Sequence, residues 1–269
     1  MSYLLGVSPQ EIRRLEFQEK VWGWMTQNLL DRLGVRSPWR CLDVGAGIGC
    51  VTLPLARRLK PKGEVVALEQ SAVYADLLHD RAKKADLKNI FLINDRLENF
   101  KWRGPGFDLI LCRWVFLFIK DIESRLKRLV PMLSPGGYLA IEDYHDYRGM
   151  TFYPESPAFE RVIPAAQKWF AKNGGGLDVA GRLPAIMAKL GLRVVDFRPN
   201  VQAGGGRSEV FRWAELFFSH YIDSIAQAGN MTPREVRDFK KTWLLRKKDP
   251  VSRFVSPIIF DVVGQKPRR

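Results

Sequence analysis

The sequence predicts an α/β fold: a doubly wound, mostly parallel seven-stranded sheet with helical lid insertions. After Pro38, short runs rich in Val, Ile and Leu alternate with longer helical patterns, which is typical of βα units. One of these runs leads into a glycine-rich turn and then into a helix. The 269 residues, 46% hydrophobic and 27% charged, are enough to bury one large core, so we expect a single domain, 1–269.

The predicted elements follow from the N-terminus. A helix over residues 8–33 comes first, because apolar residues such as Leu15, Trp22 and Met25 recur at helical spacing. Strands are predicted where Val, Ile and Leu cluster, at residues 40–44, 64–69, 90–94, 107–112, 137–142 and 192–198. Helical patterns lie at residues 50–60, 72–85, 122–133 and 180–190. Two more helices, at 208–228 and 232–247, precede a last strand, 256–263, that returns late to the sheet.

The composition excludes several classes of protein. The three cysteines, Cys41, Cys50 and Cys112, lack the paired spacing of a zinc site, so we expect reduced thiols and no metal site. The longest apolar run, 114–119, is too short to span a membrane, and no signal-peptide pattern opens the chain. We therefore expect a cytoplasmic protein. The net charge of +14 is spread along the chain, which favours a solvated basic face over a nucleic-acid partner.

The strongest local signal is the turn after the first predicted strand, Gly45-Ala46-Gly47-Ile48-Gly49-Cys50. Glycines here let the backbone approach a ligand where any Cβ would collide. A dinucleotide fingerprint needs Gly or Ala at the sixth position, which is Cys50, so NAD is the weaker interpretation. Asp43, just before the turn, would repel a pyrophosphate and attract a cationic amino acid moiety.

Acidic residues also end the next two predicted strands. Glu69 closes the second strand, where a carboxylate can accept hydrogen bonds from vicinal ribose hydroxyls. Asp95 follows the third strand and could accept a bond from an adenine amine. Strand ends in a sheet core are otherwise apolar or small, so the set points to a nucleoside ligand rather than to packing.

In residues 39–70, 94–95, 107–110 and 133–137 the chain resembles the class I S-adenosylmethionine-dependent methyltransferases, over roughly residues 10–200. The resemblance implies their Rossmann-like fold, a methyltransferase activity and S-adenosyl-L-methionine as cofactor. It places at the methionine end Asp43, Gly45 and Gly47, at the ribose Glu69, at adenine Asp95 and Arg96, and near the sulfonium Cys112 and Arg113. The same predicted site includes Ala46, Gly49 and Gln70.

The N-terminal helix resembles that of small-molecule members of this family, including the ubiquinone and menaquinone biosynthesis type. Arg14 and Gln18 lie four residues apart on one face and could reach the cofactor carboxylate, although they could equally be surface polar residues. We divide the domain into an N-terminal helix (1–35), a cofactor-binding core (36–142), lid or substrate insertions (143–178 and 200–254) and a last strand (255–264).

The sequence says less about the molecule that accepts the methyl group. The fourth strand ends in Cys112-Arg113-Trp114-Val115 and not in Asp-Pro-Pro-aromatic, and no cysteine follows proline, so base methylation is not favoured. We therefore predict methyl transfer to an O, N or C nucleophile of a small organic acceptor. The alternatives are an RNA or protein methyltransferase of the same fold and a non-catalytic, cofactor-binding regulatory subunit.

His145, after the fifth predicted strand, is the first candidate for a general base, because side chains there emerge at the active edge of an open sheet. An ordinary surface histidine is the competing interpretation. His220, in the insertion, is the second candidate. Positioning alone can supply much of the rate of a methyl transfer, so a base is not obligatory.

Overall fold

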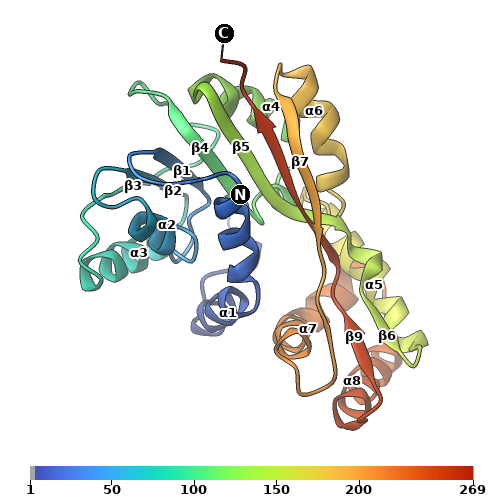
Figure 1. Ribbon diagram of the computed structural model, residues 1–269. Coiled ribbons are helices and arrows are strands. Elements are labelled where there is room, and N and C mark those ends of the chain that lie inside the picture. Colours follow the sequence, from blue (N-terminus) through green and yellow to red (C-terminus); the bar gives the residue numbers. More distant parts are fainter. Residues whose placement is uncertain (1–3, 269) are drawn as a thin grey trace.

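The computed structural model describes residues 4–268 and contains the predicted sheet (Figure 1). Its seven strands lie in the order β3-β2-β1-β4-β5-β10-β7. The parallel strands are β1 (Arg40–Val44), β2 (Glu64–Glu69), β3 (Ile90–Asn94), β4 (Phe107–Arg113) and β5 (Leu133–Asp146). The last strand, β10 (Ile258–Gln265), runs antiparallel between β5 and β7 (Arg193–Asn200). The predicted fold class, including a last strand that returns late, is confirmed.

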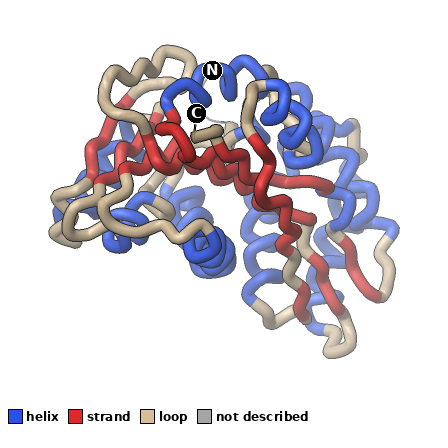
Figure 2. Tube along the Cα trace, turned by 45° about the horizontal axis from the view of Figure 1, so that its top comes forward, coloured by secondary structure: helices blue, strands red, loops and turns tan. Residues whose placement is uncertain are grey.

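Both faces of the sheet are covered, as a doubly wound fold requires (Figure 2). Alternate residues of β1 enter different hydrophobic clusters, with Leu42 and Val44 on one face and Cys41 on the other. Helix α2 (Thr52–Arg58) covers the Cys41 face, and α4 (Ile122–Leu129) and α6 (Leu183–Lys189) cover the Leu42 face. Helix α3 (Ala72–Lys84) follows β2.

The N-terminal helix α1 (Pro9–Arg32) contributes to both clusters, through Trp22 and Met25 in one and Leu29 in the other. The helix begins where the Ser8 side chain accepts a hydrogen bond from the backbone N–H of Glu11. Its C-terminal half is therefore fixed to the sheet, and its N-terminal half reaches past the sheet edge (Figure 1).

The strand order reverses between β1 and β4, because β2 and β3 lie on one side of β1 while β4 and β5 lie on the other. Val44 of β1 is in register with both Leu68 of β2 and Cys112 of β4. The residues that follow these strands therefore leave the sheet at one common edge. Ligands of open α/β sheets bind at such a switch point.

A second, three-stranded sheet lies beyond this edge and consists of β6 (Thr151–Tyr153), β9 (Arg253–Val255) and β8 (Ala203–Gly204). It packs with the helices α5 (Pro157–Lys172), α7 (Glu209–Gly229) and α8 (Pro233–Lys248), in the lower part of Figure 1. Aromatic rings fill the space between these elements; they include those of Phe152, Phe159, Phe211, Phe218, Trp243 and Phe254. None of the helices in the described chain is both long enough and apolar enough to cross a membrane.

Two elements that matter for the site, a strand and a helix, differ from the sequence prediction. The fifth strand continues from Glu142 to Asp146, and α5 lies where no helix was predicted. Pro157 and Pro164 hide α5 from a pattern search, although Pro157 stands at the first turn, where proline is tolerated.

Candidate active site

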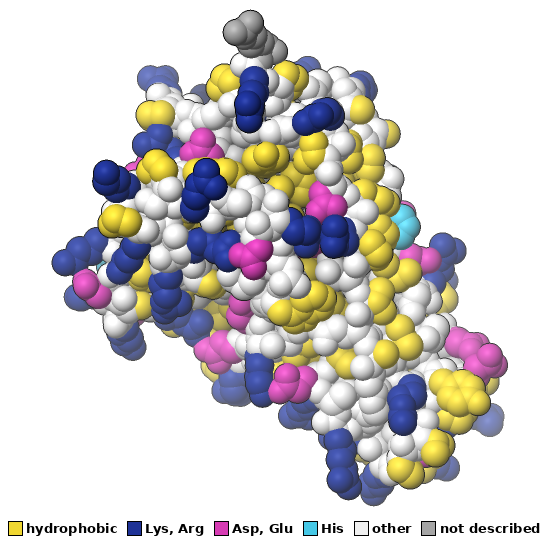
Figure 3. Space-filling view, viewed as in Figure 1, with side chains coloured by type: hydrophobic (Ala, Val, Ile, Leu, Met, Phe, Trp, Pro, Cys, Tyr) yellow, Lys and Arg dark blue, Asp and Glu magenta, His cyan; other side chains and the backbone are white. Residues whose placement is uncertain are grey.

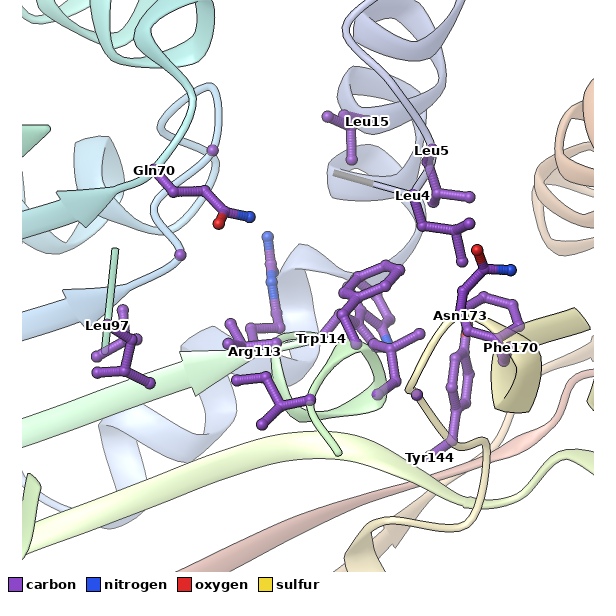
Figure 4. Close-up of a pocket in the computed structure, with 18 of the residues that line it drawn as sticks. Leu4, Leu5, Leu15, Gln70, Leu97, Arg113, Trp114, Tyr144, Phe170 and Asn173 are labelled. Carbon is purple, nitrogen blue, oxygen red and sulfur yellow. The ribbon is translucent and has the colours of Figure 1, made fainter. Parts of the chain in front are cut away.

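A cavity of about 1400 Å³ opens at the shared strand edge. The glycine turn and the ends of β2 and β4 form one part of its wall, and helices α1, α5 and α7 contribute the rest. Ligand pockets for one molecule usually measure ~300–1,000 Å³, so this cavity has room for two small molecules side by side. Figure 4 shows Gln70 and Leu97 on one side of Arg113 and Trp114, with Leu4, Leu5, Phe170 and Asn173 on the other.

The glycine turn has the backbone that the sequence predicts. Gly45, Gly47 and Gly49 all have positive φ, at 70°, 54° and 91°. A Cβ on Gly45 would lie 2.7 Å from Val115 Cγ2, so this glycine lets the segment after β4 approach the turn. A Cβ on Gly47 would meet no atom closer than 3.9 Å and would point into open space, where a ligand can approach the backbone.

Gly49 was predicted in the cofactor site, but the structure places it outside the cavity lining. A Cβ there would lie 2.5 Å from Leu78 and 3.2 Å from Leu53, so Gly49 allows close packing of helices α2 and α3. The turn itself is hydrogen-bonded to β2, because the backbone N–H groups of Gly45 and Ala46 both donate to the carbonyl oxygen of Leu68, at 2.8 and 3.0 Å. Gly45, Ala46 and Gly47 line the cavity.

Glu69 lies beneath the turn, 6% exposed, with its carboxylate held by two backbone donors. The N–H of Gly47 donates to Oε2 and the N–H of Ser71 to Oε1, both at 2.7 Å. Burial raises the pKa of Glu69, and these backbone donors oppose the rise. A carboxylate has about four lone-pair sites, so Glu69 can still accept hydrogen bonds from the cavity side.

Asp43 lies at the end of β1 and is buried. Thr52, at the start of α2, donates its hydroxyl to Asp43 Oδ2 at 2.6 Å. Burial raises the pKa of Asp43 to about 6, and the Thr52 hydrogen bond opposes that rise. The group lines the cavity, and none of the cations among residues 4–268 forms an ion pair with it, which suits a positively charged ligand group.

The third strand end contributes Asp95 and Arg96, and both line the cavity together with Gln70. Asp95 Oδ1 accepts from the backbone N–H of Arg96 at 2.7 Å and from the Asn99 amide at 3.4 Å. Gln70 projects toward the cavity in Figure 4. The structure thus brings the acidic residues of three successive strand ends to one wall.

Arg113 and Trp114 divide the cavity. The Arg113 guanidinium donates to Thr26 Oγ1 at 3.0 Å and forms an ion pair with Glu19, both on α1. Thr26 in turn donates to Glu142 Oε2 at 2.6 Å, where burial and the nearby Asp261 raise the pKa of Glu142. Sequence reasoning missed this network, because Thr26 and Glu142 are 116 residues apart.

Trp114 has φ +53°, a conformation that non-glycine residues rarely adopt. The backbone N–H of Trp114 donates to the Glu142 carbonyl oxygen at 2.9 Å, and its ring contacts the rings of Trp22 and Tyr144. The turn this creates carries Trp114 into the cavity wall. Cys112, predicted as the wall near the sulfonium, is fully buried in the core and lies outside the lining, because side chains alternate along β4.

Arg14 and Gln18 reach the cavity from α1. Arg14 forms a bidentate pair with the buried Glu11, at 2.7 and 2.8 Å, and also donates to Gln18 Oε1 at 2.8 Å. Gln18 Oε1 accepts a second bond from the Trp213 indole, at 3.1 Å. These two residues therefore belong to a polar cluster that joins α1 to α7.

The far part of the cavity is mostly apolar. Its lining includes Leu4, Leu5, Trp114, Tyr144, Tyr147, Met150, Phe170, Trp213 and Phe217. Asn173, at the end of α5, adds an amide near Phe170 (Figure 4). This chamber suits a flat or apolar molecule with few polar groups.

His145 lies outside the cavity lining, contrary to the expectation that it faces the acceptor. Its ring packs against Phe260 and Phe197, with centroids 4.6 and 6.1 Å away. The physical reason is that β5 continues through this residue, so Tyr144 faces the cavity and its neighbour faces the other side of the sheet. His220 is exposed on α7 and also lies outside the lining.

Residues 41–137 match a family model described as a methyltransferase domain. Over these residues the chain is similar to methyltransferase domains. The chain is 26% identical over 173 residues to methyltransferase str2 of Strobilurus tenacellus, covering 64% of this chain and 60% of that protein. It is also 26% identical over 164 residues to demethylmenaquinone methyltransferase of Staphylococcus aureus, covering 58% of this chain and 63% of that protein.

The chain therefore spans about three fifths of the length of the curated relatives that it matches. Among solved structures, the YcgJ protein of Bacillus subtilis is similar with a TM-score of 0.61 at 16% identity, over 90% of this chain and 97% of that one. At this identity the likeness concerns the fold of the methyltransferase domain. The matched segment, 41–137, contains the glycine turn, Glu69, Asp95 and Arg113.

Proposed function

We propose that this protein is an S-adenosylmethionine-dependent methyltransferase that acts on a small organic acceptor. The observation that carries the proposal is the single cavity that joins the glycine turn, Glu69 and Asp95 to the aromatic chamber beyond Trp114. Direct methyl transfer between two bound molecules requires that the cofactor and the acceptor lie next to each other. A cavity with a cofactor half and an acceptor half that meet at one wall meets this requirement.

The residues present fit this cofactor. A ligand can occupy the space over Gly47, which any side chain at this position would fill. Glu69 offers free lone pairs to ribose hydroxyls. Asp95 can accept from the adenine amine, and Asp43 can face the cationic amino group. Gly45 and Ala46 complete the backbone wall, with Gln70 and Arg96 at its margin. When bound, the cofactor supplies an electrophilic methyl group on its sulfonium.

The chain's own contribution is binding and orientation. Arg113, fixed by Glu19 and Thr26, and Trp114 form a rigid boundary between the two halves of the cavity. The aromatic chamber excludes water and holds the acceptor nucleophile against that boundary. Tyr144 and Tyr147 are the hydroxyl-bearing side chains on the β5 side, and burial raises the pKa of both, so they act as neutral hydrogen-bond partners.

Calorimetry with S-adenosylhomocysteine tests the cofactor half, and we expect binding at one site. The acceptor half is tested by incubating the protein with labelled cofactor and fractionated aromatic and apolar metabolites, with label transfer as the readout. Binding of cofactor without transfer to any fraction would favour a non-catalytic subunit. The three cysteines of the chain are free thiols, which supports the further proposal of a cytoplasmic location.

A further inference from the structure

The outer face of α8 exposes two adjacent leucines at the end of the molecule far from the glycine turn (Figure 1). Leu244 is 57% exposed and Leu245 is 59% exposed. The inner face of the same helix packs in the core, where Trp243 is buried against Phe152 and Phe211, at centroid distances of 5.2 and 4.8 Å. The leucines therefore play no part in the core of the helical region.

Cations surround these leucines on the same stripe of the helix. Arg237, Lys241 and Lys248 are exposed and lie seven and three residues before and four residues after Leu244. With 3.6 residues per turn, this spacing puts all of them on one side of α8. Within the part of the chain that the structure describes, these three cations have no carboxylate partner, whereas Arg234 pairs with Asp238. We call Arg237, Lys241, Leu244, Leu245 and Lys248 the α8 face.

We propose that the α8 face binds an anionic lipid surface, with α8 lying in the plane of the headgroups. Leucines of such a helix insert below the headgroup level, while lysine and arginine beside them contact lipid phosphates. Val251, just beyond the helix, is 62% exposed and extends the apolar surface. Figure 3 shows apolar side chains flanked by Lys and Arg at the lower end of the molecule, where Figure 1 places α8.

The chemistry of the face selects this occupant over two others. A nucleic acid would pair with the cations but would leave both leucines in water. A protein partner would bury the leucines, but lysine is depleted in the cores of protein interfaces. A bilayer with anionic headgroups satisfies both kinds of side chain, because the leucines reach the acyl region while the cations stay among the phosphates.

Docking through this face would also act on the wall of the cavity. Lys247, on the flank of α8, donates to Glu215 of α7 at 2.8 and 2.9 Å. Trp213 and Phe217 of α7 line the aromatic chamber. The inference itself does not depend on the proposed methyl transfer, because lipid binding is measured without cofactor or acceptor.

Vesicle flotation of the full chain tests the inference, with vesicles of phosphatidylcholine alone and of phosphatidylcholine mixed with phosphatidylglycerol. We expect flotation with the mixed vesicles and little with phosphatidylcholine. Each cation near an anionic surface strengthens partitioning by about fivefold, so Lys241→Gln/Lys248→Gln should weaken it by roughly 25-fold. Leu244→Ser/Leu245→Ser should weaken it at least about tenfold, because the inserted apolar area is lost.

Matched controls lie on α3, where Lys83→Gln/Lys84→Gln removes the same charge and Val73→Ser removes an exposed apolar side chain. Both controls should float like the wild type. Melting temperatures of all variants should stay close to that of the wild type, since every substituted side chain is exposed.

Failure of the wild-type chain to float with the mixed vesicles would overturn the proposal. Equal flotation of the leucine pair and the wild type would also overturn it, because attraction would then be electrostatic alone. The face would be assigned to nucleic acid instead if the wild type bound a mixed-sequence RNA but no vesicles. In that case the double lysine variant should lose RNA binding and the double leucine variant should keep it.

Discussion

Replacing Glu69 is the most direct test of the cofactor half of the site. In Glu69→Ala the ligand would lose its hydrogen bonds to a charged acceptor, and the N–H groups of Gly47 and Ser71 would lose their acceptor as well. Losing such bonds costs ~2–4 kcal/mol, so the affinity for S-adenosylhomocysteine should fall by about 30- to 700-fold. Glu69→Gln should also bind weakly, because its single amide oxygen can accept from only one of the two backbone donors and its N–H₂ group faces the other.

The affinity is measured by isothermal titration calorimetry, with thermal unfolding as the check that each variant is folded. Glu64→Gln is the matched control, because Glu64 lies at the opposite end of the same strand and pairs there with Arg40. Its dissociation constant should equal that of the wild type. A folded Glu69→Ala with wild-type affinity would remove Glu69 from the site and refute the reasoning.

Three further outcomes are expected. Gly47→Val should abolish cofactor binding in calorimetry, because its side chain enters ligand space rather than the core, and it should keep a cooperative melt at a lower temperature, since valine is strained at φ +54°. His145→Ala should lower the free energy of unfolding by about 1–2 kcal/mol in urea titrations, through lost packing, and leave cofactor affinity unchanged. Asp43 has a folded pKa of about 6 against an ordinary value of 3.8, so the folded chain keeps a proton that the unfolded chain releases between these values. The free energy of unfolding should therefore fall, by at most about 3 kcal/mol from this group, as pH rises from about 4 to 6, and Asp43→Asn should make that slope shallower.

Much of the sheet could be predicted because its signals are local. The first three strands begin and end where the sequence predicts them, since each is a short apolar run with polar or turn residues at its borders. The glycine turn, Glu69 and Asp95 follow those strand ends directly, so parallel pairing alone brings them to one edge. Sequence patterns therefore predicted that these residues meet at one wall of the cavity.

The acceptor half depends on contacts between distant segments. The fifth strand continues past Glu142 because its residues up to Asp146 pair with β10, far along the chain, and this extension decides which of Tyr144 and His145 faces the cavity. Side chains alternate along a strand, so an uncertain strand end makes the direction of the next side chains uncertain as well. No local pattern could show that α5 continues through Pro164.

Helix α1 connects the two halves of the site. On one side Glu19 and Thr26 hold Arg113 at the end of β4, and on the other Gln18 accepts from Trp213 of α7. Two contacts stabilise the rare backbone conformation of Trp114. Its ring packs on Trp22 of α1, and its backbone N–H donates to β5. Conformations of this kind persist only where the surroundings fix them from several directions. The boundary between the two halves of the cavity is thus held by a helix that packs on the sheet, and the same helix is tied to α7 by the bonds from Trp213 to Gln18 and from Tyr221 to Glu11.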